Sequence, residues 1–278
     1  MLKIRKEQYE ELGKISLKRF EDSMVEHIRE FFTEQYDALG ESVVRKVIEY
    51  GVDRAEAHGF ETEPDVNMYI DLMLLLGSNF DTDPQLPWAA EILQEESMED
   101  ESMEDELIED ESMEDELIED ESIAEPVGQV EKLYDQAIEY LDRIEGPEDE
   151  YLVNALDEFS DISFEELPLT RSEDIKNTTV SFLQRIWPEK CQVVGHAALP
   201  NFIRYGEESS HCYNITSQRG VVLYIVLMFM LGSGFDTDPQ FPWAATVLKD
   251  ESTINEAARI EQLYKKAIAF LDEWLIES

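Results

Sequence analysis

The chain has 278 residues, a hydrophobic content of 43%, and 65 acidic residues against 22 lysines and arginines, which gives a formal net charge of −43. This length and apolar content are enough for two domains of about 130 residues, each with its own core. A strongly acidic surface repels nucleic-acid phosphates and anionic membranes and attracts basic proteins. We therefore expect a protein partner, no nucleic acid and no membrane.

Two further features predict a protein that is made and kept in the cytoplasm. The first twelve residues, MLKIRKEQYEEL, have no apolar core of the length that a signal peptide needs. The most apolar run, Val221 to Leu231, has 11 residues, whereas a membrane span needs about 20.

Cys191 and Cys212 have no ligand-spaced partner, so we expect two small buried thiols and no disulfide framework.

Apolar residues spaced by three or four predict helices through the first part of the chain. The first helix is predicted from Lys6 to Phe32, with a break near Gly13. A second helix is predicted from Ser42 to His58, ending at Gly59, because glycine adopts the left-handed cap conformation without strain. The third is predicted to begin at the capping residue Thr62 and to end at Gly77.

The segment that includes the end of the third helix occurs twice. YIDLMLLLGSNFDTDPQLPWAA, from Tyr69 to Ala90, returns as YIVLMFMLGSGFDTDPQFPWAA, from Tyr224 to Ala245, and 17 of the 22 positions are identical at a constant offset of 155. We call these two stretches the repeated segments. In each, an Asp-Pro pair predicts a helix N-cap followed by proline, and the later Pro-Trp pair predicts a second, cap-like turn with an aromatic anchor.

A last helix predicted at 130–144 corresponds to one at 260–276, at an offset of 130 instead of 155. The difference of 25 residues locates an insertion at 96–123, which contains 16 acids and no base. Like charges at this density repel one another, so we expect a solvated low-complexity segment, the alternative being a dedicated binding element. The chain is thus predicted to be all-α, with tandem homologous helical-bundle domains at 1–145 and 150–278 and a linker at 146–149.

The repeated segments also supply the candidate binding residues: Asp81, Asp83, Trp88, Asp236, Asp238 and Trp243. An Asp-x-Asp pair can coordinate a hard cation, but a calcium loop needs further oxygen ligands where this chain has prolines and tryptophan. Turn formation and helix capping explain the aspartates better. The tryptophans are expected to close the ends of the bundles, and anchoring of a partner is the alternative.

No residue pattern carries a recognisable catalytic chemistry. The histidines of the chain have no metal-ligand spacing; they are His27, His58, His196 and His211. The position of His58 in the first copy is occupied by Tyr213 in the second. The chain has no nucleophile elbow and no phosphate-binding glycine loop. We expect no enzymatic activity, no cofactor and no bound metal; a metal-dependent enzyme that uses the Asp-x-Asp pairs is the alternative.

The motif formed by His58-Gly59-Phe60, Tyr69 and the stretch from Phe80 to Ala89 resembles a family of small helical proteins of Gram-negative bacteria. The resembling region extends roughly from Ile15 to Ala90, and the second copy keeps the stretch from Phe235 to Ala244. Genes of this family often occur in type VI secretion clusters, beside spike proteins, effectors and the adaptors that load effectors. The resemblance implies an effector adaptor or co-chaperone. The strong negative charge would alternatively suit an immunity protein that neutralises a basic toxin.

Overall fold

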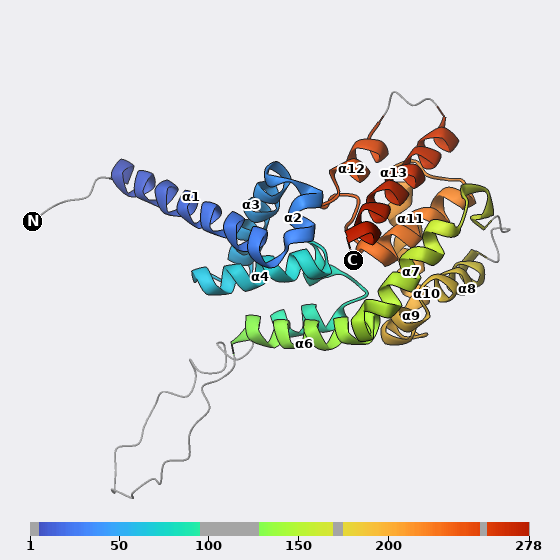
Figure 1. Cartoon of the computed structure of the whole chain (residues 1–278), viewed down its shortest axis with the longest axis horizontal. Helices are drawn as coiled ribbons and strands as arrows, with labels where there is room; N and C mark the ends of the chain where they lie inside the picture. Colours follow the sequence, from blue (N-terminus) through green and yellow to red (C-terminus); the bar gives the residue numbers. More distant parts are fainter. Residues whose placement is uncertain (1–5, 95–127, 169–174, 251–254, 278) are drawn as a thin grey trace, which may run out of the picture.

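The structure, a computed structural model, describes residues 6–94, 128–168, 175–250 and 255–277 (Figure 1). Within these ranges the chain forms helices and turns and no strand, so the predicted all-α class is confirmed. The acidic insertion predicted at 96–123 lies outside the described residues. The division into two domains is not tested by these features and stays a prediction.

The helices of the first half are α1 (Lys6–Phe31), α2 (Thr33–Leu39), α3 (Glu41–Ala57), α4 (Glu63–Leu76), the 3₁₀ turn η1 (Phe80–Thr82), a helical stretch at 87–94 and α6 (Gln129–Glu145). After the 3₁₀ turn η2 (Pro147–Asp149), the second half comprises α7 (Glu150–Asp161), η3 (Phe164–Glu166), α8 (Ile175–Ile186), α9 (Pro188–Val194), α10 (Leu199–His211), α11 (Gln218–Leu231), α12 (Pro242–Leu248) and α13 (Glu256–Glu277).

Most predicted helix ends agree with the structure to within one or two residues. Thr62 caps α4 through its side chain, which accepts a hydrogen bond from the Asp65 N–H, and Gly77 follows the helix as its C-cap. The break predicted near Gly13 is wrong, because α1 continues through it. A single glycine costs a helix about 1 kcal/mol relative to alanine, and its neighbours Glu, Leu and Lys are all good helix formers.

Helices of the two halves match at the offset of the repeat. α2 and α9 begin and end 155 residues apart, and so do α4 and α11. Their packing matches as well: a Cβ atom at Gly51 would lie 2.6 Å from the Cγ1 atom of Ile70, and one at Gly206 would lie 2.6 Å from the Cγ1 atom of Ile225. The same close approach therefore joins α3 to α4 and α10 to α11.

The halves differ where they begin. The first half starts with the 26-residue helix α1, which packs on α2 and α3 and whose amino-terminal turns project from the body (Figure 1). The second half starts with α7 and η3, and only then reaches α8. Helix α7 packs on α6, α8 and α13, so this extra element covers parts of both halves.

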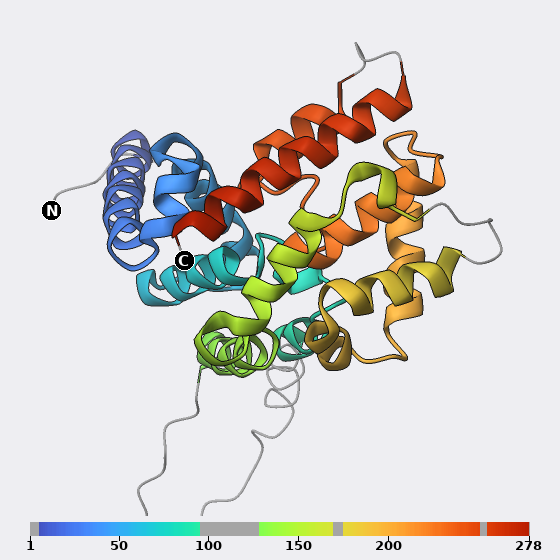
Figure 2. The ribbon, with the colours of Figure 1, turned by 45° about the vertical axis from the view of Figure 1, so that its right-hand side comes forward.

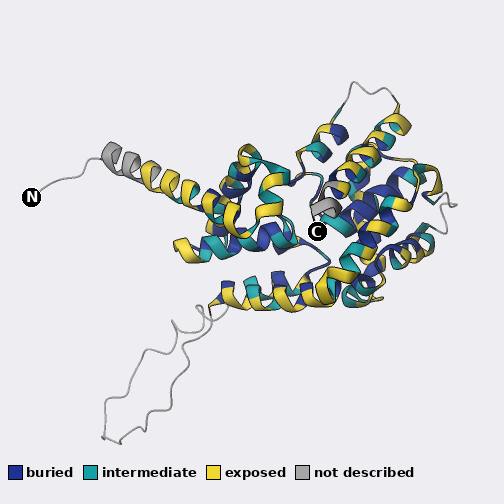
Figure 3. Ribbon diagram, in the orientation of Figure 1, coloured by how far each residue is buried: buried dark blue, intermediate teal, exposed yellow. Residues whose placement is uncertain are grey.

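The buried side chains of both halves form one continuous cluster. Helix α11 lies at its centre, because every residue from Gly220 to Phe229 is buried (Figure 3). A helix with no polar face is expected in such a position. Two further contacts connect the halves: α6 packs on α9, and α13 packs on α2, as Figure 2 shows for the red and blue helices. None of the described helices is long and apolar enough to cross a membrane.

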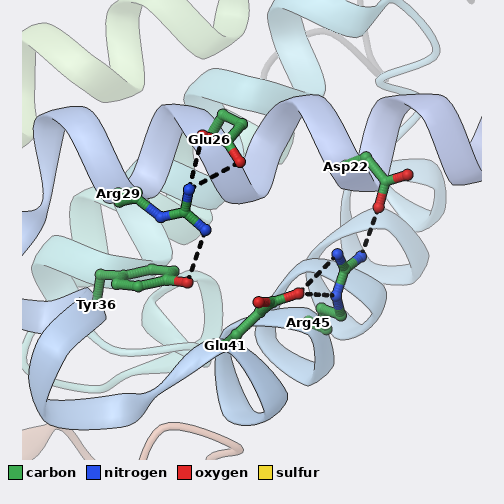
Figure 4. Close-up of polar contacts among 6 residues, drawn as sticks. All are labelled: Asp22, Glu26, Arg29, Tyr36, Glu41 and Arg45. Carbon is green, nitrogen blue, oxygen red and sulfur yellow. Dashed lines mark hydrogen bonds and ion pairs between the residues drawn. The ribbon is translucent and has the colours of Figure 1, made fainter.

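A hydrogen bond and an ion pair on the outer surface connect α1 with α2 and with α3, respectively (Figure 4). Arg29 of α1 donates a hydrogen bond to the Tyr36 hydroxyl of α2 at 3.0 Å, and Arg45 of α3 donates one to Asp22 of α1 at 2.8 Å. Exposed ion pairs contribute about 0 to 1 kcal/mol each. They orient these helices, while burial of apolar side chains supplies most of the stability.

Candidate functional site

The second aspartate of each repeated segment binds the other half of the chain. Asp83 Oδ2 accepts a hydrogen bond from the backbone N–H of Ser233 at 2.7 Å, and Asp238 Oδ2 accepts one from the backbone N–H of Ser78 at 2.8 Å. Because Ser78 and Ser233 are themselves 155 residues apart, the same contact is made twice in opposite directions. Asp83 is only 5% exposed and Asp238 only 3%, so this junction is internal.

The glutamines of the repeated segments add further hydrogen bonds between the two halves. Gln85 donates from Nε2 to the Met228 carbonyl at 3.0 Å, and Gln240 donates from Nε2 to the Met73 carbonyl at 2.8 Å. These carbonyls belong to the last turns of α11 and α4, where a helix runs short of intrahelical donors. Each half therefore contributes to the end of the other half's central helix.

Asp83 and Asp238 are not helix N-caps, contrary to the prediction. Each accepts a hydrogen bond at 2.8 Å from the backbone N–H two residues later, that of Gln85 or Gln240, which forms an Asx turn. The helix that follows, α12, has Pro242 in its first turn. The later proline starts the helix because the earlier one lies in the turn that directs the carboxylate to the other half.

Gly77 and Gly232 allow the two halves to approach each other. Their φ angles are +95° and +96°, in the region that L side chains rarely adopt. A Cβ atom at Gly77 would lie 3.2 Å from the Leu231 carbonyl oxygen, and one at Gly232 would lie 3.4 Å from the Leu76 carbonyl oxygen. Glycine is therefore required at both positions for its backbone conformation and for its lack of a side chain.

Both junction carboxylates are surrounded by donors. Asp83 accepts hydrogen bonds from the Ser233 N–H and from the N–H and side-chain amide of Gln85. Burial raises the pKa of Asp83 and of Asp238, and these hydrogen bonds act against the rise. Within the described residues, no group of three His, Cys, Asp or Glu side chains is placed to hold a metal ion.

The first aspartate of each repeated segment stays within its own half. Asp81 accepts a hydrogen bond from the Tyr69 hydroxyl, and Asp236 accepts one from the Tyr224 hydroxyl, both at 2.8 Å. Each bond joins the segment to the helix that precedes it, α4 or α11. These aspartates therefore fix the turn within each half, while the second aspartates join the halves.

The surroundings of Asp81 are charged, whereas those of its counterpart are not. Arg54 and His58 both contact Asp81 Oδ2, the histidine through Nε2 at 2.7 Å. Burial alone would raise the pKa of Asp81, but the hydrogen bonds from His58, Tyr69 and Arg54 outweigh burial and lower it. In the second half, Ser209 and Tyr213 occupy the positions of Arg54 and His58, so this ionic cluster belongs to the first half.

The tryptophans of the repeated segments are half-buried and pack on α6 and α13. The Trp88 ring lies 6.3 Å from the Tyr140 ring, and the Trp243 ring lies 5.9 Å from the Phe270 ring, measured between centroids. The indole nitrogen of each is buried without a hydrogen-bond partner among the described residues. The two rings therefore make corresponding contacts, Trp88 with α6 in the first half and Trp243 with α13 in the second. That these rings anchor a partner protein stays a prediction.

A cavity of about 120 Å³ beside the junction contains a lysine that the sequence analysis missed. Its walls are mainly apolar side chains of α4, α6, α7, α11 and α13, and Lys190, Glu145 and Trp187 also line it. Lys190 is 6% exposed, donates a hydrogen bond to the Phe229 carbonyl at 2.6 Å, and lies 4.7 Å from the centroid of the Trp187 ring. Burial lowers the pKa of Lys190 to about 8, and the negative charge of Asp83 opposes this change.

The two cysteines are in different surroundings. Cys191 is buried, and burial raises the pKa of its thiol to about 12, which makes it unreactive. Cys212 is exposed, so the prediction of two buried thiols is wrong for this residue. It directly follows the last turn of α10, which lies at the surface.

The arrangement as a whole joins two similar halves: the candidate aspartates bind protein N–H and O–H groups, and the candidate tryptophans pack on neighbouring rings. The chain matches no family model, no curated protein and no solved structure.

Proposed function

We propose that the protein is a non-enzymatic, cytoplasmic accessory protein that binds a basic protein partner. The observation that carries the proposal is the charge. Of the formal net charge of −43, the 16 acids at 96–123 account for −16, which leaves −27 on the remaining chain. A field of this size attracts a positively charged protein over a long range and accelerates its association.

The described surface agrees with this proposal. On α3, for example, Glu49, Asp53 and Glu56 are exposed, while Val44, Val47 and Ile48 are buried. Their carboxylates therefore face solvent and are available to an incoming protein. The repeated segments, in contrast, use their second aspartates inside the molecule, so we assign recognition to the helical faces.

The partner class that we propose is a type VI secretion effector, which this protein would serve as an adaptor or co-chaperone. The proposal rests on the resemblance of the region from Ile15 to Ala90 to the family described above. His58, Tyr69 and Asp81, which belong to the resembling motif, meet in one hydrogen-bonded cluster. A motif with this role maintains the fold, so the resemblance supports a shared scaffold and a shared genomic setting.

Co-expression with the proteins encoded beside this chain tests the proposal. An adaptor or co-chaperone should raise the soluble amount of its effector and co-purify with it, and deletion of its gene should reduce delivery of that effector alone. Unchanged solubility and delivery of every neighbouring effector would contradict the proposal.

The alternative is an immunity protein, which the acidic charge favours if the partner is a basic toxin such as a nuclease. An immunity protein protects cells that express the toxin in the absence of any secretion apparatus. An adaptor does not protect such cells. Survival of cells that express the toxin and this chain alone would therefore replace the adaptor assignment with the immunity assignment.

A further inference from the structure

Corresponding faces of α13 and α6 differ in whether the chain covers them. On α13, the ring of Tyr264 lies 6.4 Å from the Phe159 ring and 5.7 Å from the Phe164 ring, and its hydroxyl donates to the Ile162 carbonyl. Helix α7, its C-cap Ile162 and the following turn η3 supply these three partners. They pack on Tyr264, which forms one face of α13 together with Ile268.

The same face of α6 is formed by Tyr134 and Ile138, each 130 residues earlier. Tyr134 is partly buried against the core, as Tyr264 is, but within the described part of the chain no ring packs on it and its hydroxyl has no hydrogen-bond partner. Ile138 is 40% exposed, whereas Ile268 is partly buried against the core. The outward side of α6 lies at the surface of the molecule (Figure 3). We call Tyr134 and Ile138, with the acidic residues beside them, the α6 face.

The residues beside this apolar pair are acidic. Glu131, Asp135 and Asp142 are exposed, and with Ile138 they follow one side of the helix at spacings of four, three and four residues. An occupant of this face therefore needs an apolar stripe for Ile138 and Tyr134 and basic side chains at its edges.

We infer that the α6 face is the docking site for a basic amphipathic helix of the partner protein. The second half contains the template for this contact, because α7 and η3 place Phe159, Ile162 and Phe164 against the corresponding face of α13. The inference rests on the proposed function and adds to it the surface used and the chemistry of the partner segment.

Charge argues against the two occupants that the chain itself could supply. The segment at 96–123 ends five residues before α6 but carries 16 acids and no base, so it would be repelled by the acidic edges. A second copy of the chain brings a formal net charge of −43 to a surface of the same sign. A basic helix from another protein has the complementary charge.

A designed peptide tests the docking site directly. The probe is the chain's own sequence from Glu150 to Leu167, labelled with a fluorophore, in which every acidic residue is replaced by lysine. Its apolar residues match those that cover α13, and its edges are basic. Fluorescence anisotropy with the full chain should show saturable binding, and replacing Phe159, Ile162 and Phe164 by alanine in the peptide should abolish it.

Two matched variants of the full chain locate the binding. Ile138→Lys should weaken peptide binding at least tenfold. Tyr205→Lys, which also replaces an exposed apolar side chain on a helix (Tyr205 is 45% exposed on α10), should leave binding unchanged. Both variants add one positive charge, so a difference between them is not a general charge effect. If circular dichroism shows that Ile138→Lys is unfolded, the pair Asp135→Lys and Asp142→Lys tests the same face.

Three results would overturn the inference. The first two are no binding of the peptide to the full chain and equal binding of the peptide to both variants. The third is peptide binding at least tenfold tighter after deletion of residues 96–123, because this would show that the segment already covers the face. A complex with a secretion effector that survives Ile138→Lys would likewise reject the α6 face while leaving the proposed function intact. Conversely, specific peptide binding without any effector complex would reject the proposed function alone.

Discussion

Ser78 donates two hydrogen bonds to Asp238, which lies 160 residues further along the chain: one from its backbone N–H at 2.8 Å and one from its hydroxyl at 2.6 Å. Ser233 and Asp83 repeat the backbone bond in the opposite direction at 2.7 Å. A change in one repeated segment therefore has to suit the other segment. This mutual constraint explains why the two segments are nearly identical although His58 and Tyr213, at matching positions outside them, differ.

Alanine at Gly77 or Gly232 should destabilise the protein more than alanine at Gly59. All three glycines have positive φ angles, and this conformation costs an L residue about 1 kcal/mol or more. Only Gly77 and Gly232 also lie close to a carbonyl oxygen of the other half, whereas nothing lies within 4 Å of a Cβ at Gly59. Urea unfolding should show a loss of about 2 to 3 kcal/mol at the junction and about 1 kcal/mol at Gly59. Equal losses would show that the halves do not approach closely there.

The buried Lys190 should make the protein more stable as the pH rises from about 8 to 10.5. Its pKa is about 8 in the folded protein, against 10.5 for an unperturbed lysine. Between these values the unfolded chain binds the Lys190 proton and the folded chain does not, so Lys190 contributes an increase in the free energy of unfolding with pH of up to about 3 kcal/mol. The Cys191 thiol, whose pKa burial raises from 9.0 to about 12, contributes in the opposite direction above about pH 9. Lys190→Met should lack the Lys190 contribution, so urea unfolding across the same window should show the stability of the wild type rising relative to that of the variant. A variant with the same pH dependence as the wild type would show that Lys190 titrates normally.

The polar pair formed by His27 and Asp71 should be replaceable by the apolar pair of the second half. His27 Nε2 lies 3.0 Å from both carboxylate oxygens of Asp71, and the matching positions hold Phe182 and Val226, which are both buried. Either His27→Phe or Asp71→Val alone leaves a polar group against an apolar neighbour, and should cost about 1 to 3 kcal/mol. The double variant should come within about 1 kcal/mol of the wild type in chemical unfolding. A double variant less stable than both single variants would contradict the correspondence of these positions.

Local patterns predicted the helices and their ends, because caps such as Thr62 and Gly77 act on the residues next to them. The exchange between Asp83 and Asp238 could not be predicted in this way, since the partners of a turn carboxylate depend on how distant helices pack. The pattern also misplaced the N-cap: each segment contains two prolines, and local rules favour either as the start of a helix.

Lys190 was missed for a related reason. A lysine in a short stretch of mixed polarity gives no signal of burial, and its environment is created by Phe229 and Trp187 from elsewhere in the fold. The α6 face was likewise invisible in the sequence. Tyr134 and Tyr264 belong to the same pattern in both last helices, and only the folded structure shows that Phe159 and Phe164 pack on Tyr264 while Ile138, beside Tyr134, is exposed.

A double-mutant cycle between Ser78→Ala and Asp238→Ala tests the central claim that the repeated segments join the two halves. Because the hydroxyl of Ser78 bonds to a buried carboxylate, urea unfolding should give a coupling free energy of about 1 to 2 kcal/mol. Thr82→Ala provides the control, since the Thr82 hydroxyl is exposed and bonds within its own half to the Asn79 carbonyl, and it should show no coupling to Asp238→Ala. A coupling for Ser78 as small as that for Thr82 would contradict the account.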